Sequence, residues 1–242
     1  NFTITRNGNT TQGSFSPYGS RWSNYFDGNG DSLTYTGGSS LNFGTGDFTV
    51  ELWAFLANTG TYSPFIRPDD SGAFPEFGYD FSIGQLKFDA RNGAIVNITT
   101  AMPTNQWVHL AAARSGTNLR LFVNGTQVGT TTTNSTNFGS TTGTIRIGGS
   151  NFSASHTVNG YLSNLRVVVG TALYTAAFTP SGVPLTAISG TSLLTCQSNR
   201  FRDASSNSFA ITVNGNTSVT PFSPFVLAPP GYTTANNGGS AY

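Results

Sequence analysis

Paired carboxylates are the first residues to consider, because two of them at the right separation can hydrolyse a glycosidic bond. That reaction needs carboxyl groups about 5–9.5 Å apart, with one of them protonated. The only glutamates, Glu51 and Glu76, lie in separate segments, and the acids near Glu51 form no alternating ladder along one strand. Asp69 and Asp70 are adjacent, so in a strand they would point to opposite faces. The spacing predicts no catalytic residue and a protein that is not an enzyme.

The histidines and the single cysteine form no set that suits nucleophilic or transition-metal chemistry. His109 lies in the apolar run WVHLAAA, where we expect a packed structural histidine, because a catalytic one needs an orienting carboxylate and an exposed nucleophile. Cys196 lies in SLLTCQ, and we expect a buried, unreactive thiol. His156 lies in the loop SNFSASHTVNG, where we expect it to be exposed and able to contact a ligand.

Calcium is the one metal ion for which the sequence suggests sites, the stronger in DGNGD and a weaker one at Asp69 and Asp70. Asp27, Asn29 and Asp31 alternate with glycines in DGNGD, which places oxygen ligands on a tight turn as hard cations prefer. The same residues are also a good hairpin turn without any metal, and they lack the final Glu of an EF-hand loop. Both interpretations stand, and no other cofactor is expected.

Aromatic rings beside polar groups provide a candidate carbohydrate-binding site. Such sites combine apolar surface with a few well-placed polar groups. The segment TYSPFIRPDDSGAFPEFGYD supplies Tyr62, Phe74 and Tyr79, and the loop near His156 supplies Asn151. The alternative is that the rings of this segment alternate into the core, which we expect for Phe65 and Phe77.

The elements that must position these residues are strands. Only 9% of the 242 residues are charged, and 11 basic residues against 10 acidic ones leave no field that favours nucleic acid or a membrane surface. Residues 45–56 alternate apolar side chains, QWVHLAAARSGTNLRLFVNGTQVG reads as two strands, a turn and a third strand, and residues 77–93 read as a hairpin that turns at Gly84. Turn signals about every 8–12 residues predict an antiparallel β-sandwich. Residues 172–178 allow one helical turn.

Two distant segments repeat each other. FTITRNGNTTQGSFSPY, residues 2–18, aligns without gaps on FAITVNGNTSVTPFSPF, residues 209–225. We therefore expect an N-terminal strand and linker at 1–24, a jelly-roll domain at 25–203, and at 204–242 a segment like the start of a next repeat. Phe2, Ile4, Phe209 and Ile211 are then candidates for assembly with a neighbouring copy. The alternative is that two edge strands merely share a favourable Asn-Gly turn.

The ordered set YFDGNGDSLTY, GDFTVELWAFL, NQWVHLAAAR, LRLFVNGTQVG and VNGYLSNLRVVVGTALY resembles the laminin-G-like, concanavalin A-like lectin/glucanase domains. The resemblance implies a jelly roll of two antiparallel sheets, and it adds weight to calcium and to glycan binding. SFSPYGSRWSNYFDG and NSFAITVNGNTSVTPFSPF are also similar to modules repeated in structural proteins of marine bacteriophages.

Together these observations predict a non-enzymatic structural or adhesion module of a fibre or appendage on an extracellular or virion surface. Its expected partners are copies of itself and cell-surface polysaccharide, without nucleic acid or membrane insertion. The alternative is a calcium-dependent lectin.

Overall fold

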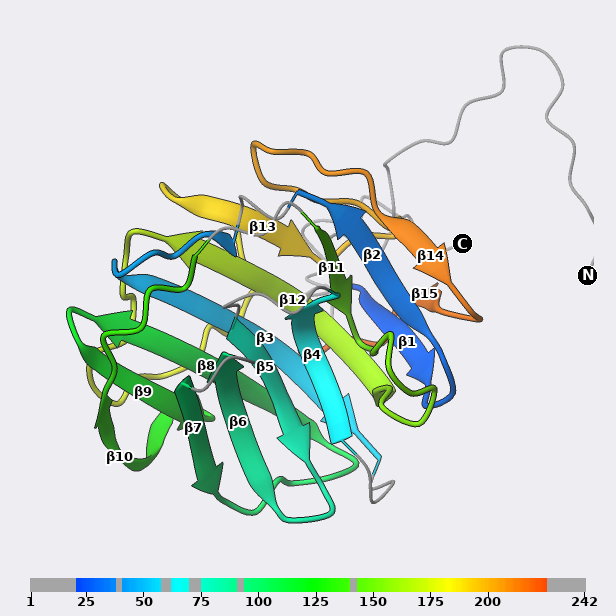
Figure 1. The fold of residues 1–242 in the computed structure, drawn as a ribbon. Helices are drawn as coiled ribbons and strands as arrows, with labels where there is room; N and C mark the ends of the chain where they lie inside the picture. The colour runs from blue at the N-terminus through cyan, green and yellow to red at the C-terminus, as the bar shows by residue number, and fades with distance from the viewer. Residues whose placement is uncertain are drawn as a thin grey trace, which may run out of the picture.

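Two antiparallel sheets pack face to face around one core (Figure 1). The computed structural model describes residues 21–37, 41–57, 62–69, 75–90, 94–139 and 143–225. Among these residues no helix is long and apolar enough to cross a membrane. The predicted all-β antiparallel sandwich is confirmed.

Over the described residues the larger sheet, here sheet A, contains eight strands. In spatial order they are β10 (Thr126–Thr133), β9 (Asn118–Val123), β8 (Trp107–Ser115), β3 (Phe48–Leu56), β12 (Asn159–Val169), β1 (Ser23–Asp27) and β15 (Ser218–Thr220), with β13 (Thr191–Thr195) also paired to β12. Sheet B contains seven strands: β14 (Thr212–Asn214), β2 (Ser32–Thr36), β11 (Thr144–Ile147), β4 (Tyr62–Pro68), β5 (Pro75–Asp80), β6 (Gln85–Ala90) and β7 (Ala94–Thr99).

The core forms because successive side chains of a strand point to opposite faces. On β3, Phe48, Val50 and Leu52 point inward and are at most 2% exposed. The ring of Phe48 stacks between those of Phe43 and Phe88, with centroids 4.3 and 5.2 Å away. Offset aromatic contacts of this kind add to the stabilisation from burial itself.

Residues 209–225 complete the edges of both sheets. We call them the closing hairpin because β14 and β15 are joined by a tight turn, although these strands pair with different sheets and not with each other. Figure 1 shows β14 beside β2 and β15 beside β1, and the backbone pairs of both strands are antiparallel. Phe209 stacks on Tyr35 at 5.0 Å between centroids, and the backbone N–H of Asn216 donates to the carboxylate of Asp31.

The closing hairpin therefore belongs to this sandwich, whereas the sequence prediction placed the domain boundary after Asp203. Unpaired edge strands expose backbone N–H and C=O groups. The closing hairpin covers those groups, because β15 pairs with β1 and β14 pairs with β2. Asp203 connects β13 to the start of the closing hairpin. Its carboxylate accepts hydrogen bonds from the backbone N–H groups of Leu194 and Phe209 at 3.0 and 3.1 Å.

The turn of the closing hairpin requires glycine at position 215. Gly215 has φ +72°, and a Cβ there would collide with the Asp31 carboxylate. We expect Gly215→Ala to lower the free energy of unfolding by about 1–3 kcal/mol, because both backbone strain and the displaced carboxylate oppose folding. Urea denaturation measures the loss. Gly182→Ala is the matched control, since a Cβ there meets nothing within 4 Å. Equal midpoints for the two variants would contradict the expectation.

Candidate functional site

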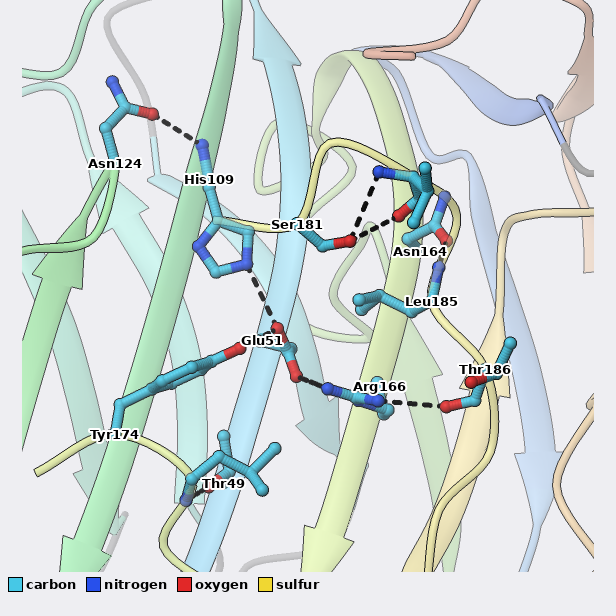
Figure 2. Close-up of polar contacts among 12 residues, drawn as sticks. Thr49, Glu51, His109, Asn124, Asn164, Arg166, Tyr174, Ser181, Leu185 and Thr186 are labelled. Carbon is cyan, nitrogen blue, oxygen red and sulfur yellow. Dashed lines mark hydrogen bonds and ion pairs between the residues drawn. The ribbon is translucent and has the colours of Figure 1, made fainter. Parts of the chain in front are cut away.

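Several ionisable side chains that could take part in a reaction meet on the outer face of sheet A (Figure 2). Glu51 of β3 accepts a hydrogen bond from the Arg166 Nε–H at 2.9 Å on one carboxylate oxygen and from the Tyr174 hydroxyl at 2.8 Å on the other. Its second oxygen lies 3.1 Å from His109 Nε2. No hydrogen-bond partner lies near Nδ1 of His109 within the described structure, so the ring contacts its polar surroundings through Nε2.

An irregular segment, residues 171–188 and here called the strap, covers this cluster. Thr49 fixes its start, because its hydroxyl accepts from Leu173 N–H at 2.8 Å and donates to the Thr171 carbonyl at 3.0 Å. Arg166 fixes its end by donating to the Thr186 carbonyl at 2.9 Å (Figure 2). The helical turn expected at residues 172–178 is absent, since this part of the strap follows the sheet surface instead.

The cluster is closed to any ligand, with Glu51 0% and His109 1% exposed. Burial by itself would raise the pKa of Glu51, but the hydrogen bond from His109 and the charge of Arg166 outweigh it, so the pKa lies below its ordinary value. The carboxylate is therefore ionised and holds the strap on the sheet. His109 is the packed histidine that the sequence predicted.

Removing one partner from this buried network is expected to be costly. Glu51→Gln leaves Arg166 buried without its counter-charge, so we expect a loss of about 3–5 kcal/mol in the free energy of unfolding. Asp69→Asn is the matched control, because Asp69 also pairs with an arginine, Arg146, but the two side chains are 18% and 17% exposed. That change should cost less, about 1–2 kcal/mol, because water reaches this bidentate pair. Urea denaturation of both variants tests this, and similar losses would show that burial does not decide the cost.

A second polar cluster lies on the outer face of sheet B. Phe77 and Phe88 point into the core, so their neighbours Glu76 and Asp89 point outward, and the strand register sets these two acids opposite each other. Gly78 and Lys87 are the next outward pair.

Contacts link this face into one network. The Arg67 Nε lies 3.4 Å from a carboxylate oxygen of Glu76, and the Lys87 Nζ lies 5.4 Å from the centre of the Tyr62 ring. Burial, and then the charge and hydrogen bond of Glu76, raise the pKa of the Tyr62 hydroxyl well above its ordinary value. Gly78 leaves the room in which the Tyr62 ring lies.

The loop at residues 148–157 extends the same network with aromatic rings. His156 meets Tyr62 edge to face at 5.8 Å between centroids, and the Arg67 guanidinium lies 4.6 Å from the centre of the Phe152 ring. Phe152 is 56% exposed, so one face of its ring is available to a ligand. Asn151 is also exposed, and its amide donates to the Asp69 carbonyl at 3.0 Å. We call Tyr62, Arg67, Glu76, Lys87, Asp89, Phe152 and His156 the sheet B cluster.

The structure thus gathers Tyr62, Asn151 and His156 on one side of the molecule. The prediction that Tyr79 belongs to the same binding site is wrong. The Tyr79 ring is buried, 3% exposed, and its hydroxyl donates to the Thr100 carbonyl at 2.8 Å. Tyr79 follows Phe77 by two positions, so strand alternation puts both rings on the core side. Phe65 and Phe77 are core residues as expected, both 0% exposed. Phe74 lies outside the described residues.

Sequence spacing also missed the Glu76–Asp89 pair and the contributions of Arg67, Lys87 and Phe152. The pair is separated along the chain and meets only through the β5–β6 hairpin. A signal was present, because a hairpin that turns at Gly84 pairs Asp80 with Gln85 and therefore brings Glu76 opposite Asp89.

The turn suggested for calcium is held together by its own hydrogen bonds. Asp31 is 1% exposed, and its two oxygens accept the backbone N–H groups of Asp27 and Asn216. Asp27 accepts the backbone N–H of Asn29 at 2.8 Å. Over the described ranges no group of three or more His, Cys, Asp or Glu residues could hold a metal ion. Calcium at this turn stays a prediction that needs a binding measurement.

The other sequence-predicted residues, Phe209 and Ile211, pack against this chain's own core. They are therefore used within the sandwich before any contact with another copy. Phe2 and Ile4 lie outside the described residues.

Asp89 is expected to make stability depend on pH. Burial raises its pKa from 3.8 to about 6, Lys87 opposes this rise, and the facing Glu76 adds to it. The folded chain therefore keeps a proton to about pH 6 that the unfolded chain has lost near pH 4, so stability falls as pH rises between those values.

Asp89→Asn should remove this component, and its advantage over the unchanged chain should grow between about pH 4 and 6. Urea denaturation across that range measures it. Parallel profiles for the unchanged chain and Asp89→Asn would contradict the expectation.

Comparison with known proteins identifies the family. Residues 27–175 match the family model described as the concanavalin A-like lectin/glucanases superfamily, and the chain belongs to this superfamily. No curated protein matches the sequence.

Solved structures share the fold at low sequence identity. A candidate carbohydrate-binding protein from Bacteroides ovatus superposes with a TM-score of 0.58 and 16% identity, over 83% of this chain and 59% of that protein. A heptameric SAP-like pentraxin from Limulus polyphemus gives a TM-score of 0.58 and 15% identity, over 82% of this chain and 94% of the pentraxin. At such identities the likeness shows the fold alone. The chain spans 59% of the length of the Bacteroides protein.

Proposed function

We propose that this chain is a non-enzymatic adhesion module that binds glycan through the sheet B cluster. The observation that carries the proposal is the exposed Phe152 ring, held by Arg67 beside the Tyr62–His156 pair. Membership in the lectin/glucanase superfamily and the fold shared with a candidate carbohydrate-binding protein support it.

The chemistry of the cluster suits a sugar. A pyranose ring has apolar C–H faces that pack on an aromatic ring, and hydroxyls that both donate and accept hydrogen bonds. Lys87 and Asp89 of β6 are partly exposed and supply a donor and an acceptor, whereas Arg67 and Glu76 are 2% and 9% exposed and hold the aromatic rings in place. Because both signs of charge are present, the cluster favours a hydroxyl-rich polysaccharide over a strongly ionic one. The outer face of sheet A offers less, since the strap and the closing hairpin cover much of it.

The setting we propose is a fibre or appendage on an extracellular or virion surface. The chain has few charges, and its sequence resembles modules repeated in bacteriophage structural proteins. A single shallow site binds weakly, and repetition along a fibre would raise the effective affinity through multivalency.

Glycoside hydrolysis is the second candidate function, and one observation favours it. Glu76 and Asp89 are opposed carboxylates, and Asp89 has a raised pKa of about 6. However, Glu76 is 9% exposed and paired with Arg67, which leaves it poorly placed to attack a sugar. We expect no release of reducing ends from any polysaccharide that the chain binds. Release that is lost in Asp89→Asn would replace adhesion by hydrolysis.

The test of adhesion is a glycan array together with a bacterial polysaccharide screen, using the purified chain. Phe152→Ala combined with His156→Ala should weaken binding about tenfold or more, because truncating aromatic anchors commonly costs over about 1 kcal/mol. Tyr62→Phe should weaken it less, since only the hydroxyl near Glu76 is lost.

Val183→Ala is the matched control, because Val183 is an apolar side chain on the strap that is 66% exposed. It should bind like the unchanged chain. No binding by a folded sample, or equal losses in control and test variants, would remove the sheet B cluster as a glycan site.

Calcium is tested in the same screen, run with calcium and with a chelator. Binding lost on chelation, accompanied by a calcium-dependent rise in melting temperature, would support the calcium-dependent lectin and point to the Asp27–Asp31 turn. Binding that is unchanged by the chelator would rule calcium out of recognition.

A further inference from the structure

The sequence that repeats near the N-terminus is the sequence of the closing hairpin. Residues 2–18 align with residues 209–225, so a chain carries two versions of the segment that completes the edges of β1 and β2. The structure gives one version a place, and the contacts there show which residues a second version would need.

Residues that hold the turn of the hairpin are the same in both segments. Asn214, Gly215, Asn216 and Thr217 correspond to residues 7–10, which read Asn, Gly, Asn and Thr. Asn214 donates from its amide to the Ser32 carbonyl, and the Thr217 hydroxyl donates to the Asn214 carbonyl at 3.1 Å. The left-handed glycine and the Asn216 N–H fit against Asp31.

Residues that pack the hairpin on the sandwich are also kept. Phe209, which stacks on Tyr35, corresponds to Phe2. Phe222, which contacts Phe55 at 5.0 Å between centroids and also Trp107 and Tyr161, corresponds to Phe15. Phe225, which meets Trp53 edge to face, becomes the aromatic Tyr18.

The two segments differ at seven positions. Ala210, Val213 and Pro221 are exposed, and residues 3, 6 and 14 replace them with Thr, Arg and Ser. All three residues of β15 also change, but a strand pairs with its neighbour through its backbone, which every side chain here permits. Two occupants of one position would keep the packed rings and the turn in this way and vary elsewhere.

We infer that residues 2–18 of one copy take the place of the closing hairpin on a second copy of this chain. Each sandwich has one such place, formed by the edges of β1 and β2, and its own residues 209–225 compete for it. Exchange of equivalent elements between copies creates a contact without a new interface, and a head-to-tail contact that does not close extends into a fibre. This inference is independent of glycan binding.

Disulfide crosslinking between differently labelled chains tests the exchange. Thr212 of the hairpin pairs with Thr34 of β2, and Thr212 corresponds to Thr5. A donor chain carrying Thr5→Cys is mixed with an acceptor carrying Thr34→Cys in a reversible thiol buffer, so that the yield reports occupancy. The native Cys196 is buried and its pKa is raised to about 12, so it does not compete.

We expect a covalent dimer of donor and acceptor, with more dimer when the acceptor also carries Gly215→Ala and holds its own hairpin less tightly. Gly8→Ala in the donor should lower the yield about tenfold, because residue 8 must adopt the left-handed conformation of Gly215. Gly13→Ala is the matched control. Its counterpart in the closing hairpin is Thr220, so this position accepts a side chain, and the yield should be unchanged. A single chain with both Thr34→Cys and Thr212→Cys verifies that the geometry permits a bond.

Light scattering of the chains without added cysteines gives an independent readout. The Gly215→Ala chain should have the mass of a dimer or larger species, and adding Gly8→Ala should return it to a monomer. The inference is overturned if the mixed chains give no dimer while the intrachain control forms its disulfide. It is also overturned if Gly8→Ala and Gly13→Ala give equal yields, or if Gly8→Ala leaves the mass of the Gly215→Ala chain unchanged.

Discussion

The buried carboxylate of Glu51 is the constraint around which sheet A is arranged. An ion at the centre of a sheet that is covered on both faces must be compensated within the protein, because water cannot reach it. Arg166, His109 and Tyr174 provide that compensation from the neighbouring strands and from the strap. The irregular strap thus has one defined path across the sheet, although it contains no regular element of its own.

The outer faces of the two sheets differ in what they can do, because the outer face of sheet A is covered. The strap and the aromatic side chains of the closing hairpin lie on the outer face of sheet A, which makes that face part of the scaffold. The outer face of sheet B instead carries interacting acids and bases, in a protein with 9% charged residues. A recognition surface on that face can vary its polar residues with little effect on the packing of sheet A.

The closing hairpin connects the stability of one unit with its association. It pairs with an edge of each sheet, and Asp31 and Asp203 hold its turn and its start. Edges that are completed by a separate segment can accept that segment from the same chain or from another, since the hydrogen bonds are the same in both cases. The acidic turn at Asp27–Asp31 accordingly serves the hairpin, whatever it does with cations.

The sequence by itself determined the strands of the core and the sandwich, and it showed that residues 2–18 resemble residues 209–225 but not where the second segment lies. The strands and the sandwich follow from local patterns, such as the alternation of Phe48, Val50 and Leu52, and a turn at Gly84 that fixes the pairing of the strands on either side of it. Sequence analysis also singled out Tyr62, Asn151 and His156, which the structure brings to one side of the molecule, and their part in binding stays a prediction. Applied consistently, the same alternation would have placed Tyr79 in the core beside Phe77.

Only the tertiary structure decided which distant residues meet. Glu51 and Arg166 come together through the pairing of β3 with β12, and Phe152 reaches Arg67 because a loop folds over β4. The strap has no periodic pattern, so nothing in its sequence shows that it lies on Glu51. Strand periodicity is a property of neighbours along the chain, whereas charge compensation and the make-up of a surface depend on which strands lie side by side, and that is settled when the two sheets pack.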